Sequence, residues 1–451
     1  MSQIAVQDHL ENIGHTIAGE ASEPSKDRHA GATRSRVADD APLRRLRVGL
    51  LGCGRIGQAV VATARAERAR LAAAGVDIAF VRALVRDIDK PRDARVPVVG
   101  AADAFAVEDL DVLVEVLGGV EPARAIVARA LAAGVAVVTA NKTLVAREGE
   151  GLDRIAREHG AVFAYDAAVL AGVPFLGSLA RRPLLSGAHR LAGIVNGTSH
   201  AITTALEAGG TFEAALADAV ARGYAEPDSS ADISGRDAAE KLTILLRLAG
   251  VASANVDAIT RIGIDALAPE DFVGARRLGG VIKPIALAAL ADDLHGAWVG
   301  PAFVGGAHPI ARTTGVTNVL QISGAAGRSA FDVPDVIFQG PGAGPSATAA
   351  TIIDDIVEAV DATPARRPAA ARPACDVGQP PAGPWFVRLA RAGATVDRDT
   401  IVSLGLSVER VEQGDGWAAA LTGATTWHNV QRAASCARTR GFAALATPAL
   451  I

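Results

Sequence analysis

A cluster of acidic residues precedes a lone lysine in the stretch GYAEPDSSADISGRDAAEKLTILLRLAG, which begins at Gly223. The cluster consists of Glu226, Asp228, Asp232 and Asp237, within twelve residues of one another, and the lysine is Lys241. Carboxylates can hold an ammonium group, while a partly desolvated lysine has a lowered pKa and can transfer a proton. The pattern therefore suits the binding of a small zwitterionic substrate together with proton transfer.

Lysine is scarce in this chain, because only five of its 45 basic residues are lysines and the rest are arginines. The five are Lys26, Lys90, Lys142, Lys241 and Lys283. The guanidinium of arginine essentially never releases its proton, so a proton-transfer site cannot use it. Lys142 follows the apolar run VAVVTAN, at the predicted carboxyl end of a parallel strand, where open α/β sheets bind ligands. Lys142, Lys241 and Asp237 are therefore the candidate catalytic residues.

A purely structural interpretation of Asp237 and Lys241 stays open. Residues Ser234 to Asp237 fit a capping box, in which Asp237 would only close the first turn of a helix. Asp237 and Lys241 are also four residues apart, the spacing of an ordinary helical ion pair worth about 0.2–0.5 kcal/mol. The acidic cluster around them favours the functional interpretation.

The sequence GCGRIG contains Gly52, Gly54, Arg55, Ile56 and Gly57 and follows an apolar strand directly. This is the GxGxxG pattern of a dinucleotide-binding turn, in which the glycines let a pyrophosphate approach the backbone at the start of a helix. The strand–turn–helix context strengthens the prediction, although FAD and other nucleotides share the fingerprint.

The end of the second predicted strand, VRDIDKPR at 85–92, bears on the choice of coenzyme. Arg86 and Lys90 could accept the 2′-phosphate of NADP, and NAD remains possible. Alternatively, these charges are only a solvated strand end.

Apolar runs alternate with helices over residues 46–141, which predicts an α/β fold with a doubly wound parallel sheet of the Rossmann type. The predicted elements are a strand running into the glycines (46–57), a helix ending at Gly75, strands at 78–85, 111–119 and 135–141, and a helix at 122–134. Further on, the pattern predicts strand–turn–helix over 189–210, a helix at 235–249 and a glycine-rich turn that enters another helix near 345.

With 451 residues the chain is too long for one hydrophobic core. We predict a disordered polar tail (1–44), an NAD(P)-binding domain (45–165), an α+β substrate-binding and dimerisation domain (166–335) and a returning segment (336–360) that completes the nucleotide domain. A Pro/Ala-rich linker (361–384) then precedes a small, separate module (385–451). That module reads as strand (385–390), helix (397–405), strands (407–412 and 416–422), helix (427–440) and strand (442–446).

Composition excludes several classes of protein. The net charge of −4 provides no electrostatic footprint for nucleic acid, and the chain lacks a membrane-length apolar segment. The three cysteines lie far apart, without the spacing of a metal site or a disulfide framework. We expect a cytoplasmic protein that binds neither nucleic acid nor membrane.

Several stretches, taken together, resemble the homoserine dehydrogenase family. They are GCGRIG, LGGVEPAR, VVTANKTLVA, YDAAVLAGVPF, GIVNGTSHAI, GYAEPDSSADISGRDAAEKL and FQGPGAGPSATA. The resemblance implies an oxidoreductase that interconverts L-aspartate 4-semialdehyde and L-homoserine with NAD or NADP, in the biosynthesis of threonine, methionine and isoleucine. An aspartate-type amino-acid dehydrogenase and a non-catalytic regulatory homologue remain as alternatives.

The resemblance also implies roles for individual residues. Lys241 matches the proton donor, and Lys142 matches a second active-site lysine. Glu226 and Asp237 match the acidic residues that hold the amino group and the hydroxyl end of the substrate. The implied substrate-binding set is Glu226, Asp232, Asp237, Lys241, Asn196, Gly197 and Thr198. The implied coenzyme-binding set adds Gly118, Thr139, Asn141, Lys142 and Gly342 to the glycine fingerprint, Arg86 and Lys90.

The family further implies a monovalent cation, Na⁺ or K⁺, on a loop that matches Asp166, Val169, Ala171 and Val173. The module at 385–451 resembles a degenerate ACT domain, because RAGATVDRD stands where that fold usually carries an acidic-x-Pro-Gly turn. We therefore expect the module to pair subunits rather than to bind threonine, in a homodimer or homotetramer.

Overall fold

The computed structural model describes residues 43–173, 188–226, 228–291, 294–324, 335–342, 344–361 and 377–451. Nearly all of the predicted tail and residues 362–376 of the predicted linker lie outside these ranges. Within them, no helix is both long and apolar enough to cross a membrane.

A six-stranded parallel sheet occupies the first part of the chain, in the order β3-β2-β1-β4-β5-β6. Its strands are β1 (Arg44–Leu51), β2 (Val76–Leu84), β3 (Val98–Val99), β4 (Val112–Glu115), β5 (Ala136–Thr139) and β6 (Phe163–Ala164). The side chains of β4 and β5 are fully enclosed, as expected for a sheet covered on both faces. This is the strand order of the Rossmann fold, and it confirms the predicted fold class.

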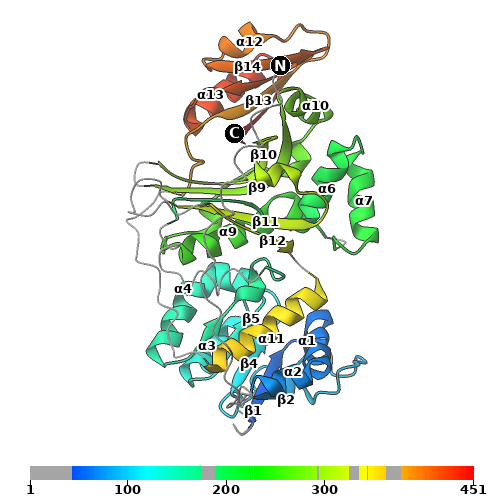
Figure 1. Ribbon diagram of the computed structural model, residues 1–451, viewed down its shortest axis with the longest axis vertical. Helices are drawn as coiled ribbons and strands as arrows, with labels where there is room; N and C mark the ends of the chain where they lie inside the picture. Colours follow the sequence, from blue (N-terminus) through cyan, green and yellow to red (C-terminus); the bar gives the residue numbers. More distant parts are fainter. Residues whose placement is uncertain are drawn as a thin grey trace, which may run out of the picture. The chain divides into compact units, whose positions relative to one another are not determined.

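Five helices lie against this sheet: α1 (Arg55–Ala66), α2 (Arg68–Ala73), α3 (Ala123–Ala132), α4 (Lys142–Glu158) and α11 (Pro345–Asp361). The sequence predicts one helix up to Gly75, whereas the structure has two, because the chain changes direction at Glu67. Helix α11 packs on α1 although almost 300 residues separate them in the chain (Figure 1). The end of the returning segment therefore packs against the nucleotide-binding half.

A second, mixed sheet holds the other ten strands, nine of them along the path β12-β11-β7-β9-β10-β16-β13-β15-β14. The strands that come from the middle region of the chain are β7 (Arg190–Ile194), β9 (Gly280–Ala291), β10 (Leu294–Gly305), β11 (Thr317–Ser323) and β12 (Val336–Pro341). The short strand β8 (Thr260–Arg261) pairs with β10. Strand β12 pairs with β11, so the first part of the returning segment belongs to this sheet and not to the nucleotide-binding half.

The helices of the middle region are α6 (Gly197–Glu207), α7 (Phe212–Ala221), α8 (Ser230–Ile233), α9 (Arg236–Leu248) and α10 (Pro269–Arg277). Short 3-10 turns cover Val256–Ala258, Ile264–Ala266 and Pro309–Arg312. Helix α9 packs on both α4 and β9, so it lies between the two sheets. Residues 237–246 of this helix are all buried, which leaves no solvated face for an ordinary surface ion pair.

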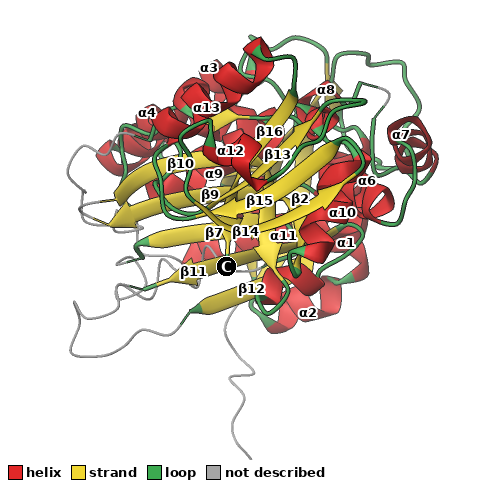
Figure 2. Cartoon of the chain, turned by 90° about the horizontal axis from the view of Figure 1, so that it is seen from above, coloured by secondary structure: helices red, strands yellow, loops and turns green. Residues whose placement is uncertain are grey.

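The C-terminal elements follow the predicted βαββαβ order: β13 (Trp385–Ala390), α12 (Arg398–Val402), β14 (Val408–Gly414), β15 (Trp417–Thr422), α13 (Trp427–Thr439) and β16 (Ala443–Leu450). They do not form a separate sheet, because β16 pairs with β10 at Phe303–Ala449 and Val304–Leu450. Figure 2 shows the strands of both regions from above, and the β10–β16 pairing joins them into one sheet.

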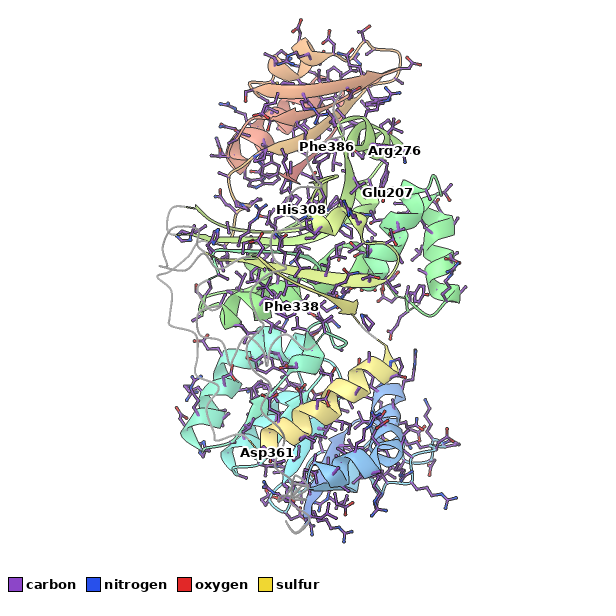
Figure 3. All side chains as sticks on the ribbon, viewed as in Figure 1. Glu207, Arg276, His308, Phe338, Asp361 and Phe386 are labelled. Carbon is purple, nitrogen blue, oxygen red and sulfur yellow. The ribbon has the colours of Figure 1, made fainter. Side chains whose placement is uncertain are left out.

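Aromatic packing strengthens this junction. Trp298, Trp385 and Trp427 form one cluster, with ring centroids 5.3–6.0 Å apart. Phe386 stacks on Phe303 at 5.9 Å, and Figure 3 labels it close to α10. Rings of this size contribute most of the apolar area buried at such a contact. The C-terminal elements therefore share a core with the middle sheet.

Candidate active site

Three helices begin where the polar motifs of the sequence meet. Helix α4 starts directly after β5, at the carboxyl edge of the parallel sheet, and its first residue is Lys142. Helix α6 starts after β7 with Asn196 as its N-cap. Helix α9 starts after Gly235, which has φ +76°. This left-handed conformation favours glycine, and a Cβ there would lie 2.9 Å from Val299.

One carboxylate is shared by both candidate lysines. The Nζ of Lys241 lies 2.8 Å from Oδ2 of Asp237, and the Nζ of Lys142 lies 3.2 Å from Oδ1. Lys241 also donates to the backbone oxygen of Val195 at 2.8 Å. An ammonium has three N–H groups, so these two contacts leave Lys241 one further proton to donate. The structure therefore brings together the three residues that the sequence predicts as catalytic.

The charges of this trio stabilise one another. Burial raises the pKa of Asp237, but the two ammonium groups and the hydrogen bonds from Lys241 and Asn196 outweigh it, so the pKa falls below its usual range. Asp237 in turn raises the pKa of Lys142. The side chain of Lys142 is 38% exposed and that of Lys241 only 10%. Asp237 thus remains a carboxylate, and Lys142 is the more open of the two cations.

Asn196 ties the trio to a second carboxylate. Its Nδ2 donates to Oδ1 of Asp232 at 2.6 Å and to Oδ2 of Asp237 at 2.7 Å. Its Oδ1 accepts from the backbone N–H of Ser199 at 2.7 Å and so caps α6. Both polar atoms of this amide are therefore occupied, and its orientation is set by the cap. Burial raises the pKa of Asp232.

The capping-box interpretation of Asp237 is wrong. Gly235 is the N-cap of α9, and its helix start receives no side-chain cap hydrogen bond. Asp237 and Lys241 do form the i,i+4 pair that the spacing allows, but both side chains are buried. A buried pair that also contacts a second lysine and an amide differs from a surface ion pair, which contributes little to stability.

Glu240 is a site carboxylate that the sequence analysis missed. It is 5% exposed and accepts a hydrogen bond from the hydroxyl of Thr143, the residue after Lys142, at 3.0 Å. Burial raises the pKa of Glu240, and the charge of Glu240 adds to that of Asp237 in raising the pKa of Lys142. The sequence signal that could have identified Glu240 is its position next to Lys241 in DAAEKL. Because α9 is buried around Lys241, the neighbouring Glu240 is buried with it.

The glycine turn has the shape that a pyrophosphate requires. Gly52 has φ +100°, and a Cβ at Gly57 would lie 2.3 Å from the oxygen of Gly52, so both positions require glycine. A Cβ at Gly54 would meet nothing within 4 Å among the described residues, and Gly54 is exposed. No side chain caps the start of α1, so the backbone N–H groups of Arg55 and Ile56 at its first turn are open to an anion. These features fit a dinucleotide.

The loop after β2 presents basic side chains to solvent. Arg86 and Lys90 are exposed. The carboxylate of Asp87 accepts from the backbone N–H groups of Asp89 at 3.0 Å and Lys90 at 3.2 Å. Arg92 donates to the backbone oxygen of Asp87 at 2.6 Å. Asp87, the first acidic residue after β2, therefore has its Oδ1 engaged within its own loop, and Asp89, the second, is exposed.

Comparison with known proteins agrees with this geometry. The family model "Homoserine dehydrogenase, NAD binding domain" matches residues 52–166, and "Homoserine dehydrogenase" matches 174–357. The homoserine dehydrogenase of Bacillus subtilis is 32% identical over 70% of this chain and 73% of its own length. That of Mycobacterium tuberculosis H37Rv is 35% identical over 69% and 71%. The chain belongs to the homoserine dehydrogenase family.

Solved homoserine dehydrogenases share the fold. That of Thiobacillus denitrificans is 30% identical with a TM-score of 0.79, over 90% of this chain and 99% of its own. A share of 90% must include part of the C-terminal elements. A hyperthermophilic archaeal homoserine dehydrogenase, solved in complex with NADPH, has 24% identity and a TM-score of 0.58 over 72% of this chain.

Most of the remaining predicted coenzyme residues lie at the same sheet edge, and Gly342 does not. Gly118 has φ +80° and an open flank, like Gly54. Thr139 ends β5, and Asn141 caps α4 through Leu144. Gly342 packs on the side chain of Asn318 so closely that a Cβ would collide with it. The structure thus groups Gly118, Thr139, Asn141 and Lys142, with Gly342 on the opposite, middle-sheet side.

Some predicted substrate residues of the enzyme stand apart from the lysines. Glu226 is exposed in the loop before α8, and the described contacts of Lys142 and Lys241 do not include it. Asp228 is exposed and accepts from the backbone of Ser230. The hydroxyl of Thr198 donates a hydrogen bond to the backbone oxygen of Tyr224 at 2.6 Å. Gly197 begins α6, where its backbone N–H points out of the helix start.

The predicted cation loop is compact and buried. Asp166, Val169, Ala171 and Val173 are each at most 8% exposed. Leu170 has φ +55°, which is uncommon for a non-glycine residue and turns the loop sharply. The hydroxyl of Thr351 in α11 donates to the oxygen of Ala171, which occupies one of its two lone pairs.

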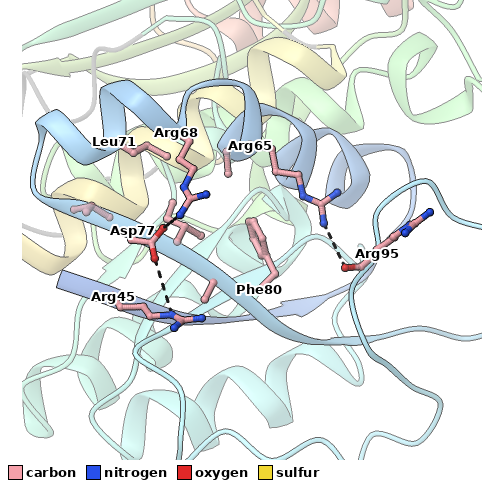
Figure 4. A pocket seen from close by; sticks show the side chains of 11 residues that line it. Arg45, Arg65, Arg68, Leu71, Asp77, Phe80 and Arg95 are labelled. Carbon is pink, nitrogen blue, oxygen red and sulfur yellow. Dashed lines mark hydrogen bonds and ion pairs between the residues drawn. The ribbon is translucent and has the colours of Figure 1, made fainter. Parts of the chain in front are cut away.

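One hollow of the enzyme lies away from this site. It has a volume of about 270 Å³ between α1, α2 and the first half of β2 (Figure 4). Arg45 and Arg68 flank Asp77 there at 4.0 and 3.6 Å, and Arg65 donates to the oxygen of Arg95. Its lining comes from the amino-terminal half of β2, opposite the carboxyl edge that carries the glycine turn, so it contributes nothing to the active site.

Proposed function

We propose that this protein interconverts L-aspartate 4-semialdehyde and L-homoserine at the Lys142–Asp237–Lys241 trio. The observation that carries the proposal is the shared carboxylate, with Nζ distances of 2.8 and 3.2 Å, beside the carboxyl edge of a dinucleotide-binding sheet. Such an edge is where open α/β sheets bind ligands. Membership of the homoserine dehydrogenase family supports the same reaction.

The nicotinamide coenzyme, when bound, supplies or accepts the hydride at the carbon that is aldehyde in one direction and alcohol in the other. In the reducing direction Lys241 donates a proton to the carbonyl oxygen and becomes a neutral amine. In the oxidising direction that amine takes the hydroxyl proton back. Asp237 stabilises the ammonium form, and positioned proton transfer of this kind typically contributes about 10²–10⁴-fold in rate.

Two groups of residues would hold the ends of the substrate. We assign the substrate ammonium to carboxylates at the mouth of the site, Glu226 and Asp232. We assign its carboxylate to the start of α6, where the backbone N–H groups of Gly197 and Thr198 precede the first intrahelical bond. Lys142, which is 38% exposed, would bind the substrate oxygen or carboxylate and hold Asp237 in place.

NADP is the coenzyme that the loop after β2 favours. Oδ1 of Asp87 accepts two hydrogen bonds from its own loop, which weakens Asp87 as a partner for a ribose diol, whereas Arg86 and Lys90 are exposed and suited to a 2′-phosphate. The archaeal homologue solved with NADPH is consistent with this preference. NAD remains the second candidate.

We also propose a monovalent cation on the loop of Asp166, Val169, Ala171 and Val173, and assembly as a homodimer or homotetramer. The carboxylate of Asp166 and the backbone oxygens of Val169, Ala171 and Val173 are ligands of a kind that Na⁺ and K⁺ accept. The backbone oxygen of Ala171 accepts one hydrogen bond, from Thr351, and has a second lone pair for a cation. Size-exclusion chromatography with light scattering measures the mass of the assembly directly.

The test is reduction of NADP and NAD by purified protein in the presence of L-homoserine, in KCl, NaCl or choline chloride. Activity that requires homoserine, is greater with NADP and falls in choline chloride agrees with all three assignments. Reduction of the coenzyme that requires L-aspartate instead of homoserine, and that releases ammonia, would identify an amino-acid dehydrogenase. A folded protein that binds NADPH but turns over neither substrate would identify a non-catalytic homologue.

A further inference from the structure

Glu115 is a fully buried carboxylate at the coenzyme edge to which neither the family model nor the sequence motifs give a role. It is the last residue of β4 and is 0% exposed. Within the described residues it forms no ion pair with a lysine, arginine or histidine. Leaving an acidic side chain buried without a cation is costly unless several hydrogen bonds satisfy it. Burial accordingly raises its pKa.

Neutral donors from two separate turns satisfy Glu115. Its Oε2 accepts from the hydroxyl of Thr139 at 2.5 Å, and its Oε1 accepts from the backbone N–H of Leu117 at 2.8 Å and from Nδ2 of Asn141 at 3.3 Å. Leu117 begins the turn at Gly118 and Gly119, whereas Thr139 ends β5 and Asn141 lies in the turn that follows it. The carboxylate therefore joins the two turns that follow neighbouring parallel strands.

Asn141 extends this network to the first residue of α4. Its Nδ2 also donates to the oxygen of Gly119 at 2.6 Å, and its N–H donates to the hydroxyl of Thr139 at 3.0 Å. Its Oδ1 accepts from the N–H of Leu144 at 3.1 Å, which caps the helix. The next residue is Lys142, which reaches Asp237 at 3.2 Å. The backbone N–H and both side-chain polar atoms of Asn141 are thus hydrogen-bonded, which fixes the start of α4.

We propose that Glu115 is a positioning residue that, through Thr139 and Asn141, holds the start of α4 so that the Nζ of Lys142 meets Asp237. Glu115 does not touch the reacting atoms. It fixes the direction from which a long, flexible side chain leaves the helix, and misplacement of a reacting group by about 1 Å can cost on the order of 10²-fold in rate. The inference rests on the proposed function of Lys142.

Substitution tests the role in two ways. Glu115→Gln keeps the shape but places an amide where Oε2 or Oε1 accepts hydrogen bonds, so we expect kcat to fall on the order of 10- to 100-fold. Lys142→Ala should lower kcat by itself, and adding Glu115→Gln to it should change kcat by less than about 2-fold, because the effect passes through Lys142. Multiplying effects in the double variant would overturn the proposal.

Amide hydrogen exchange of the coenzyme-free protein gives a readout that does not depend on catalysis. We expect Glu115→Gln to speed exchange in peptides covering 116–119 and 141–146 and to leave the peptide of β7 unchanged. Faster exchange throughout the chain would indicate a general structural role and would contradict the proposal. Unchanged exchange together with wild-type kcat would also contradict it.

Two further variants keep the test interpretable if Glu115→Gln folds poorly. Thr139→Ser keeps the hydroxyl that Glu115 accepts, whereas Thr139→Val removes it at nearly constant volume. Only Thr139→Val should reproduce the local rise in exchange. Glu158→Gln is the matched control, because Glu158 lies at the exposed end of the same α4 helix and, among the described residues, pairs only with Arg154, at 3.0 Å. If the wild type lacks dehydrogenase activity the proposed function fails, yet the exchange data still test the network.

Discussion

At the residue scale, the site depends on one carboxylate that two ammonium groups share. Asp237 has lysines on both of its oxygens, and Asn196 donates to the one that Lys241 also contacts. The arrangement keeps Asp237 charged, and it makes the two lysines unequal. Lys241 is enclosed and bound by the oxygen of Val195, whereas Lys142 is more than a third exposed. Their roles can therefore be separated by substitution.

Replacing each lysine by arginine preserves charge and removes the ability to exchange a proton near neutral pH. We expect Lys241→Arg to lower kcat about 10²–10⁴-fold, the contribution of a general acid. Lys142→Arg should retain at least about tenfold more activity than Lys241→Arg, because its proposed role is to bind charge. Initial rates at saturating substrate, with NADPH affinity from fluorescence titration as the control, measure both. The opposite ranking would exchange the roles of the two lysines.

His200 predicts a pH dependence of stability. It is fully buried, with Nδ1 2.9 Å from the oxygen of Thr317 and Nε2 3.2 Å from that of Thr313. Burial, together with the nearby charge of Lys283, lowers its pKa to about 4. The unfolded chain, with an ordinary histidine pKa near 6.5, therefore binds a proton first as pH falls. The part of the unfolding free energy that depends on neutral His200 is fully present above about pH 6.5 and is lost as the pH falls from about 6.5 to 4.

The loss attributable to His200 is on the order of 3 kcal/mol over that window. His200→Asn removes the titrating group, so the difference in unfolding free energy between pH 7.5 and 4.5 should shrink relative to the wild type. Urea denaturation at several pH values measures it. An identical pH dependence in both proteins would show that His200 does not contribute to acid stability. His159, which is exposed near the end of α4, provides the matched control His159→Asn.

At the element scale, local patterns predict the elements themselves but not all of their partners. Apolar runs and the glycine fingerprint predicted the parallel sheet, and turn spacing predicted the βαββαβ order after Pro384. The pairing of β16 with β10 was not predictable, because edge strands carry no local mark of the strand they meet. The contact of Thr143 with Glu240 spans 97 residues and depends on how α4 packs on α9.

The site was predictable to a similar degree. The paired lysines and Asp237 could be proposed from residue type and spacing, and the structure brings them together. Glu115 was missed although a glutamate inside the apolar run DVLVEVLGG is itself a signal. A charged residue in a strand buried on both faces must find partners, and only the fold reveals that they are Thr139 and Asn141.

The start of α6 serves both stability and catalysis, and substitutions of Asn196 separate the two. Asn196→Ser keeps a side-chain acceptor for the cap but loses the donor to Asp232 and Asp237. Asn196→Asp keeps the cap and adds a carboxylate beside those of Asp232 and Asp237. We expect Asn196→Ser to cost about 1 kcal/mol of unfolding free energy or less. Asn196→Asp should cost several times more, because like charges meet out of water.

Chemical denaturation provides the unfolding free energies of both Asn196 variants, and initial rates provide kcat. Both variants should lower kcat, since each releases Asp237 from the amide. Thr211→Ser, at the exposed cap of α7, is the control for substitution at a helix start. Equal stability losses in Asn196→Ser and Asn196→Asp would show that Asp232 and Asp237 do not feel the added charge.

At the scale of the whole molecule, the C-terminal elements are built into the middle sheet. Besides the β10–β16 pairing, a buried ion pair joins them: Arg388 of β13 donates to both oxygens of Asp271 in α10, at 2.9 and 3.1 Å. The two residues are 117 positions apart. Arg276 of the same α10 donates to the backbone oxygen of Glu207 in α6, and both residues are labelled in Figure 3. These contacts connect the C-terminal elements with the helix that Asn196 caps.

This connection predicts that the C-terminal elements and the middle sheet unfold in one step. Removing one partner of a buried pair leaves an uncompensated charge, so Arg388→Ala should cost about 3–5 kcal/mol, and adding Asp271→Ala should recover part of it. All four tryptophans of the chain, at 298, 385, 417 and 427, lie in these two regions. Their fluorescence should therefore follow a single thermal transition at the same temperature as enzymatic inactivation. An earlier fluorescence transition that leaves activity intact would mean that the module unfolds independently, as a separate sensory domain would.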